Sequence, residues 1–291
     1  MTTFSSTRME PFIFSRTSTT GVAGTTEASF TTHRPRQEVH LSDFDSDGKC
    51  DVLLVDKTSG ATRLMLNAYD GSTFAFEDKG IVTGRATCTE GYGRGKHDLG
   101  VRWHDLTGDK RADMLCIKSD GTVTGYINKG INDLVDQGTI VESQGRERAN
   151  LRFADINGDG RTDLLFVNMT DGAVTAWYND GWNLSAKNAF RWNSQGIISP
   201  GGFSRGATIE LAALNSSRAD YISVKPSTNE AWTWFNVCPG SEGPAAPNLP
   251  SDAPPIQRLY RTRSKAPHRP LAQRSPMLSC LRRRLRSLPP L

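Results

Sequence analysis

Three short acidic segments are the parts of this 291-residue chain whose residue types and spacing best suit chemistry. Each segment has oxygen-bearing side chains at positions 1, 3, 5 and 9 of a nine-residue loop. These residues are Asp43, Asp45, Asp47 and Asp51; Asp105, Thr107, Asp109 and Asp113; and Asp155, Asn157, Asp159 and Asp163. Calcium accepts about six to eight oxygen ligands in a tolerant geometry, so a loop that folds short acidic side chains inward suits it. The loops are therefore predicted to bind calcium.

The three loops differ in the residue at position 6. Gly48 and Gly160 occupy it in the first and third loops, and glycine adopts a left-handed backbone easily. Lys110 occupies it in the second loop, which costs about 1 kcal/mol if that backbone is required and adds an opposing charge. We expect the second site to be weaker. A fourth related segment, residues 213–220, keeps only Asp220 and is expected to bind no metal.

An EF-hand and a simple hairpin turn are the alternatives to this kind of loop. An EF-hand requires Glu at position 12, where this chain has Leu54, Cys116 and Phe166, so the loops are not EF-hands. In a hairpin turn, the Asp and Asn side chains would only cap their own backbone. Turns do not require several facing acids, however, and like charges at short range repel unless a cation neutralises them.

The loops belong to a repeat. Each is followed by an apolar run, a polar turn, and a second run ending in Asn67, Asn128, Asn179 or Asn236. From the last Asp of each loop to that Asn the spacing is 16, 15, 16 and 16 residues. Short runs rich in Val, Ile and aromatic residues, separated by Asp-Gly turns, indicate strands and hairpins. The sequence predicts an all-β fold: a β-propeller or partial propeller of about four blades, each a four-stranded antiparallel meander.

A family resemblance rests on these residues. The phrase at residues 153–163, followed by that at residues 172–179, resembles the FG-GAP or VCBS-type repeats of integrin-α-like β-propellers, in their fungal-style secreted form. The resemblance implies that each loop also binds calcium through the backbone carbonyl of position 7. In this chain those residues are Lys49, Arg111 and Arg161. Family propellers usually close with about seven blades. This sequence is thus a shortened version, a fragment, or a propeller completed by partner chains as an oligomer.

Composition divides the chain into three parts. Residues 1–33 are rich in Ser and Thr, residues 34–240 hold the repeats, and residues 241–291 are Pro-rich and then basic. The two end segments are expected to be flexible or disordered. Residues 256–291 contain ten Lys or Arg and no acid, so the rest of the chain has a net charge of −6. The tail lacks the interleaved aromatics of a nucleic-acid arm, and no nucleic-acid partner or membrane span is expected, although a nucleic-acid role for the tail stays an alternative.

No catalytic set is legible in the sequence. Ser204 lies in a Gly-Phe-Ser-Arg-Gly segment like a hydrolase nucleophile elbow, but a predicted strand follows it rather than a helix. His40 and His104 lie in strands that lead into loops, where packing is a simpler role than zinc binding. The chain is predicted not to be an enzyme.

The functional prediction is a calcium-stabilised binding or scaffold module of an extracellular protein, with a carbohydrate or protein surface as its ligand. Trp182 and Trp192 lie off the repeat register and are the candidate sugar-stacking residues. The alternative is the accessory repeat region of a secreted SGNH-type esterase whose catalytic domain lies outside this chain.

Overall fold

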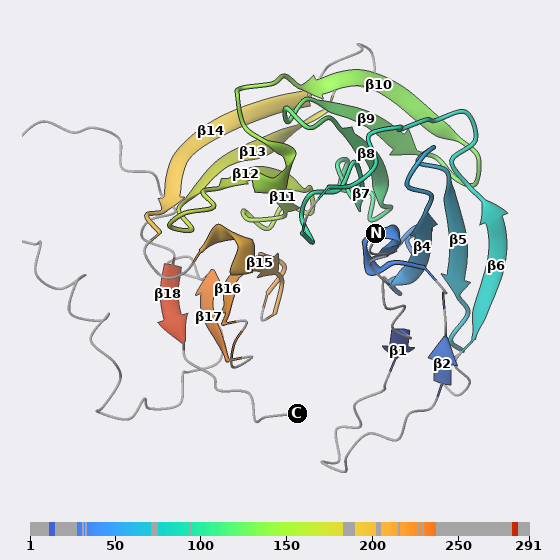
Figure 1. The fold of residues 1–291 in the computed structure, drawn as a ribbon, viewed down its shortest axis with the longest axis horizontal. Coiled ribbons are helices and arrows are strands. Elements are labelled where there is room, and N and C mark those ends of the chain that lie inside the picture. Colours follow the sequence, from blue (N-terminus) through green and yellow to red (C-terminus); the bar gives the residue numbers. More distant parts are fainter. Residues whose placement is uncertain are drawn as a thin grey trace, which may run out of the picture.

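Four antiparallel sheets of four strands each are arranged as a four-bladed β-propeller in this protein. The structure is a computed structural model. It describes residues 32, 34–70, 75–93, 95–182, 190–201, 205–214, 216–225, 227 and 230–236, together with three short strands at 12–14, 28–30 and 281–284. In Figure 1 the sheets fan around a common centre, with β7, β11 and β15 toward the middle and β6, β10 and β14 outside. The predicted fold class is confirmed.

Each blade is an antiparallel meander whose strands follow chain order from inside to outside. The first blade contains β3 (Val39–Ser42), β4 (Asp51–Val55), β5 (Thr62–Asn67) and β6 (Phe76–Ile81). The second contains β7 (Val101–His104), β8 (Asp113–Ile117), β9 (Val123–Asn128) and β10 (Leu134–Val141). The third contains β11 (Leu151–Ala154), β12 (Asp163–Val167), β13 (Val174–Trp182) and β14 (Phe190–Ser199). The fourth contains β15 (Ile209–Ala212), β16 (Asp220–Val224), β17 (Ala231–Asn236) and β18 (Leu281–Arg284).

The segments outside the repeats also contribute strands. β1 (Phe12–Phe14) pairs with β2 (Ala28–Phe30) in the Ser/Thr-rich part, and β18, from the basic tail, pairs with β17. Short 3-10 helices precede three inner strands: η1 (Arg36–Glu38), η2 (Arg148–Asn150) and η3 (Gly206–Thr208). The fourth blade thus takes its last strand from beyond residue 240, and the boundaries at residues 33 and 240 stay predictions.

The hydrophobic core lies between neighbouring blades. One buried cluster joins Leu53 and Leu64 of the first blade to Trp103 and Met114 of the second. Two further clusters join the second blade to the third and the third to the fourth in the same way. The second strands β4, β8 and β12 share one burial pattern, with four of five residues buried, because they are covered on both faces. Blade packing therefore supplies the burial that a single meander could not.

A buried aspartate fixes each acidic loop to its own blade. In the second blade, Asp113 is 0% exposed and accepts backbone N–H bonds from Leu106 and Asn128, both at 2.8 Å. The corresponding pairs of bonds in the other blades are made by Asp51, Asp163 and Asp220. We call this arrangement the Asp–Asn link. It explains the constant spacing from the last Asp of each loop to the Asn, because the two residues are hydrogen-bonded across strands.

The asparagine of the link also ties each blade to the one before it. The Asn128 side-chain amide donates to the carbonyl oxygen of Phe44 in the preceding loop at 2.9 Å, and to that of Ala112 in its own loop at 3.0 Å. Asn179 and Asn236 repeat both contacts. A backbone bond from Ala112 N–H to the Asp43 carbonyl, 2.8 Å, runs beside them and recurs in the next two blades. The loops of consecutive blades are thus joined directly.

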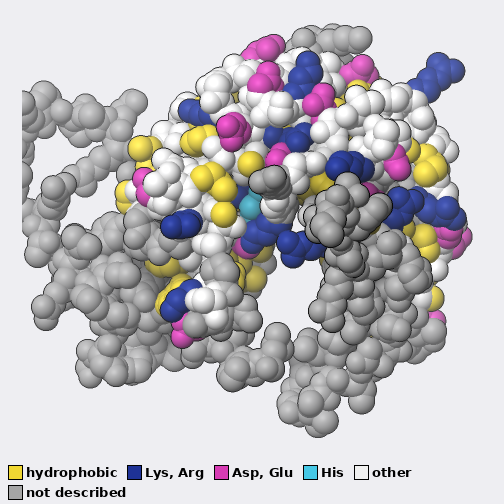
Figure 2. Space-filling model, in the orientation of Figure 1, with side chains coloured by type: hydrophobic (Ala, Val, Ile, Leu, Met, Phe, Trp, Pro, Cys, Tyr) yellow, Lys and Arg dark blue, Asp and Glu magenta, His cyan; other side chains and the backbone are white. Residues whose placement is uncertain are grey.

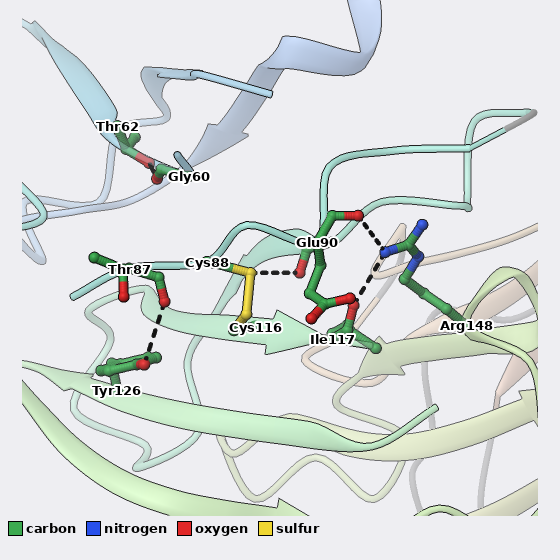
Figure 3. Close-up of a disulfide and its surroundings, with 10 residues drawn as sticks. Gly60, Thr62, Thr87, Cys88, Glu90, Cys116, Ile117, Tyr126 and Arg148 are labelled. Carbon is green, nitrogen blue, oxygen red and sulfur yellow. Dashed lines mark hydrogen bonds between the residues drawn. A yellow bond between two sulfur atoms is a disulfide. The ribbon is translucent and has the colours of Figure 1, made fainter. Parts of the chain in front are cut away.

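A disulfide adds a covalent connection at the join of the first two blades. Cys88, in the segment that follows β6, is bonded to Cys116 on β8 (Figure 3). The same segment accepts a hydrogen bond at its Glu90 carbonyl from Arg148, whose guanidinium also reaches the Ile117 carbonyl. Gly60 must be glycine here, because a Cβ atom would lie 2.5 Å from the Cys88 carbonyl oxygen and φ is +73°. The first blade is therefore anchored to the second by more than packing.

Replacing Asn128 by Ala tests the link between blades. The change leaves the buried carbonyl groups of Phe44 and Ala112 without their amide donor, so we expect the free energy of unfolding to fall by about 2–4 kcal/mol. Asn67→Ala is the matched control, because Asn67 is half-buried and its amide reaches only the Cys50 carbonyl. The free energy of unfolding of Asn67→Ala should fall by less than about 1 kcal/mol, since water can hydrogen-bond to the Cys50 carbonyl in place of the amide. Equal losses in urea denaturation would contradict the role given to the link.

Candidate metal centre

The first residue of each intact loop is a cap for the loop backbone. Asp43 accepts N–H bonds from Ser46 at 2.7 Å and from Gly48 at 2.9 Å, one on each carboxylate oxygen. Asp105 and Asp155 accept the equivalent bonds in their loops. Backbone capping therefore accounts for the hydrogen bonds at position 1. It leaves a lone pair on each carboxylate oxygen, so capping and metal binding are compatible.

The first loop gathers three carboxylates. Oxygen atoms of Asp43, Asp45 and Asp51 all lie within 4.8 Å of one another. Asp45 makes a single weak contact as an acceptor, from the Asp47 N–H at 3.2 Å, while Asp51 is completely buried. Among the residues that the structure describes, no other group of three such side chains converges in this way.

In the first and third loops, the aspartate side chain at position 5 points toward the basic side chain at position 7. Asp47 forms an ion pair with the Lys49 ammonium, and Asp159 pairs with the Arg161 guanidinium at 2.6 Å. Both aspartates also accept the backbone N–H of their basic partner. The predicted carbonyl ligands Lys49 and Arg161 therefore carry side chains that compete for the position-5 carboxylate. In this conformation Asp47 lies outside the group of three.

The second and third loops have fewer free carboxylates. In the second loop Thr107 replaces an acid at position 3, and its hydroxyl oxygen lies 3.5 Å from a carboxylate oxygen of Asp105. Asp109, at position 5, accepts the Arg111 backbone N–H at 3.0 Å. In the third loop the Asn157 amide donates to Asp159 at 3.1 Å. Each loop retains the ligand types predicted for it, without the convergence seen in the first. In the fourth blade Asp220 makes only the Asp–Asn link.

Burial disfavours negative charge on the last aspartate of each intact loop. Burial raises the pKa of Asp51, and the nearby charges of Asp45 and Asp47 raise it further, against two backbone N–H bonds that lower it. Burial likewise raises the pKa of Asp113 to about 8 and that of Asp163 to about 6. A cation held by the loop would relieve this cost, because it would neutralise the carboxylates where they stand.

Two positions in each loop have a left-handed backbone. At position 6, φ is +82° for Gly48, +70° for Lys110 and +86° for Gly160, so the second loop holds a lysine where glycine is favoured. At position 4, φ is +71° for Ser46, whereas the other two loops have glycine there. The requirement at position 6 was predicted from the sequence. The strain at Ser46 was not.

The aromatic candidates have different outcomes. Trp192 is partly buried, donates its indole N–H to the Ile140 carbonyl at 2.7 Å and stacks beside Phe190. It therefore joins the second and third blades and has little freedom to stack on a ligand. The side chain of Trp182 and the whole of Ser204 lie outside the described residues. His104 packs on Phe153 with ring centroids 5.5 Å apart, in agreement with the predicted packing role.

Sequence reasoning missed the basic residues on the inner strands. Arg102 on β7 and Arg152 on β11 are 6% and 5% exposed, and both face the centre of the propeller. Their shared place in the repeat, three residues before Asp105 and Asp155, was the available signal. It is a weak signal, because a basic residue in a short strand is more often exposed than buried.

Fold and loops together define a β-propeller of acidic-loop repeats. Comparison with family models identifies residues 105–166, from the second loop to the strand after the third, as an FG-GAP-like repeat. The predicted resemblance is confirmed over this range. A search of curated proteins finds no match.

Solved structures with a similar fold share little sequence with this chain. A structure of an Agrocybe aegerita lectin that recognises non-reducing terminal N-acetylglucosamine has 19% identity and a TM-score of 0.44, over 74% of this chain and 54% of the lectin chain. The Photorhabdus luminescens Tc holotoxin pore has 20% identity and a TM-score of 0.43, over 67% of this chain and 9% of the toxin chain. The present chain thus spans about half of one and a small part of the other. Scores of this size carry no functional argument.

Lys110→Gly should raise the free energy of unfolding by about 0.5–1 kcal/mol, because it removes a side chain from a left-handed position. Lys118→Gly is the matched control: its backbone is not left-handed, so the same change should lower stability by about 0.5–1 kcal/mol. Thermal and urea unfolding of both variants without added metal would measure the effect. A loss of stability in Lys110→Gly would contradict the strain argument.

Proposed function

We propose that this protein is a calcium-stabilised β-propeller module of an extracellular protein that binds a carbohydrate or protein surface. The observation that carries the proposal is the convergence of Asp43, Asp45 and Asp51 in the first loop. Three carboxylates at this range repel one another, and no basic side chain among the described residues forms an ion pair with any of them. A divalent cation supplies the missing charge.

The donor set fits calcium. Calcium–oxygen distances are about 2.3–2.6 Å, so oxygens on opposite sides of one ion are separated by about 5 Å. Separations within 4.8 Å therefore suit a shared ion. The donors are all hard oxygens, without the nitrogen or sulfur that zinc prefers. The carbonyl of Lys49 and water would complete the set, and the third loop offers the same types of ligand with Asn157 at position 3.

Calcium acts as a clamp in this proposal. Asp51 belongs both to the cluster of three carboxylates and to the Asp–Asn link. A cation that neutralises Asp51 therefore stabilises the loop conformation that the link also holds. The fourth blade forms its link with Asp220 alone and without the other carboxylates. Metal therefore stabilises a blade that the link already defines.

Two features support an extracellular setting. The disulfide between Cys88 and Cys116 is of a kind that persists in oxidising compartments. FG-GAP-like repeats are commonly extracellular and typically non-catalytic. Within the described part of the chain, no helix is long and apolar enough to cross a membrane.

Removing calcium should lower the melting temperature. At a calcium concentration 100 times the dissociation constant, one site contributes about 2.7 kcal/mol, and EDTA should abolish this increment. Asp45→Ala should lose most of the calcium increment while unfolding in EDTA much like the unmodified protein, because Asp45 accepts only one 3.2 Å bond. Calorimetry with and without calcium measures both effects.

Asp120→Ala is the control for this experiment. Asp120 accepts the Thr122 backbone N–H at 2.9 Å in an exposed turn outside the acidic loops. Its replacement by Ala therefore removes one side-chain-to-backbone hydrogen bond, as Asp45→Ala does, but no proposed calcium ligand. The calcium increment should survive in this variant. If EDTA leaves the melting temperature unchanged and titration calorimetry finds no calcium uptake, the calcium proposal is wrong.

The ligand is tested separately from the metal. On a glycan array, the full chain with calcium should bind a restricted set of glycans, and EDTA should weaken that binding because the blades loosen. Binding to no glycan would remove the carbohydrate branch and leave a protein surface as the ligand class. That result would not affect the calcium measurement, so the two parts of the proposal fail independently.

A further inference from the structure

A cavity of about 240 Å³ lies at the inner strands of the blades. Its walls come from β3, β7, β11 and β15 and from the segment that precedes β7. In Figure 2, Lys and Arg side chains lie beside a histidine near the middle of the displayed face, between the blades. None of these elements contributes a carboxylate of the first acidic loop, so the cavity is separate from the proposed calcium site.

One repeat position supplies a residue to the cavity from each blade. It is the second residue of the inner strand: His40, Arg102, Arg152 and Glu210 in chain order. Two of the four are arginines whose side chains are almost completely buried. Buried arginines are usually paired with a carboxylate, because an uncompensated charge in a protein interior is costly.

Neither arginine has such a partner among the described residues. The Arg102 guanidinium donates to the carbonyls of Leu151 at 2.7 Å and Arg148 at 2.9 Å, and also to that of His97. Arg152 donates to the carbonyls of Ala149 and Leu151, both at 2.8 Å. These acceptors are neutral and do not compensate the charge. In both arginines the buried Nε–H group has no hydrogen-bond partner.

The remaining polar groups of the cavity do not balance the charge. The Lys96 ammonium forms an ion pair with Glu210, and the buried Nε2 atom of His97 lies 3.6 Å from the same carboxylate without a hydrogen bond. Among the described residues that line the cavity, Glu210 is the only carboxylate, against the basic side chains of Lys96, Arg102 and Arg152. Asp98, nearby, is already engaged by Arg148 at 2.7 Å. An excess of positive charge therefore faces this space.

The titration behaviour of the cavity agrees with an excess of positive charge. Burial, followed by the charges of Arg152, Lys96 and Arg102, lowers the pKa of His97 to about 2. Burial and the neighbouring arginines lower the pKa of Arg102 to about 9, which leaves it charged at neutral pH. Burial is the main cause of both shifts, and the neighbouring positive charges act in the same direction.

We propose that the central cavity binds a tetrahedral oxyanion, the chemistry shared by phosphate, sulfate and their monoesters. An oxygen of such an anion would accept a proton of Lys96 in a charge-assisted hydrogen bond, while the anion's negative charge would balance the buried guanidinium groups of Arg102 and Arg152, which no carboxylate compensates. A water molecule takes about 30 Å³ of liquid volume, so the cavity has room for a small anion. Arginine suits such a site because its guanidinium stays charged at neutral pH even when buried.

Titration calorimetry of the full chain tests the proposal, with sodium sulfate and sodium phosphate as probes and ionic strength held constant with sodium chloride. Saturable heat at one site per chain is expected with either anion, and chloride should give none. Glucose 6-sulfate and glucose distinguish an ester from the free ion: binding of the sulfate ester, but not of glucose, shows that the cavity admits a monoester. Binding of inorganic anions alone restricts the site to free ions. Absence of saturable heat from every anion would overturn the proposal.

Variants that remove positive charge and a variant that removes negative charge from the cavity should change anion affinity in opposite directions, which identifies the cavity as the site. Arg102→Gln should weaken anion binding by about tenfold or more, because it removes a buried positive charge that no carboxylate balances. Lys96→Gln should weaken it by about fivefold, whereas Glu210→Gln should strengthen it by about fivefold, since that carboxylate repels an anion and engages Lys96. Arg63→Gln is the control: Arg63 on β5 is exposed and paired with Asp78 on β6, away from the cavity, so its loss should not change anion affinity.

The Glu210→Gln result also separates ligand binding from a structural role. Arg102 bridges β7 to η2, so Arg102→Gln can fail to fold for that reason alone. Lys96 and Glu210 are partly exposed, and their variants keep the proposal testable in that event. A purely structural cluster predicts no gain in anion affinity from Glu210→Gln. An unchanged or reduced affinity in this variant, or an equal loss in Arg63→Gln, would overturn the assignment.

Discussion

The Asp–Asn link is the interaction on which the rest of this structure depends. A completely buried carboxylate, Asp113 in the second blade, accepts two backbone N–H groups that would otherwise be unpaired, one from its own loop and one from Asn128. The amide of Asn128 then reaches the Phe44 carbonyl in the preceding loop. A buried polar group must find its partners, so the link fixes loop, blade and neighbour together.

The acidic loop is built on this fixed point. The residue that ends each loop is already held by two hydrogen bonds, so the chain between positions 1 and 9 has to fold back over it. The carboxylate at position 1 caps that fold, as Asp43 does for Ser46 and Gly48. Additional carboxylates at positions 3 and 5 do little for the fold, and the fourth blade shows this because Asp220 keeps its link without them. Their presence in the first loop is the basis of the proposed calcium site.

The repeat register could be predicted from sequence because it reflects local chemistry. The Asp-to-Asn spacing, the strand runs and the left-handed position at Lys110 are each determined within one blade. The strain at Ser46 was missed because serine gives no signal of it. The Asp47–Lys49 ion pair depends on side-chain rotamers, and the Cys88–Cys116 pairing was one of several that five cysteines allow. The added strand β18 comes from a tail whose composition suggested disorder.

The central cavity could not be predicted for a different reason. Its residues come from the inner strands of four blades, so Arg102 and Arg152 meet only after all the blades have packed. Arg102 on β7 and Asp105, just after this strand, stand three residues apart and carry opposite charges, yet the arginine binds carbonyls of the next blade rather than this aspartate. Propeller geometry thus separates the three convergent carboxylates of the first loop from the buried arginines of the inner strands. Neither set neutralises the other, and this is the electrostatic basis of both proposed ion sites.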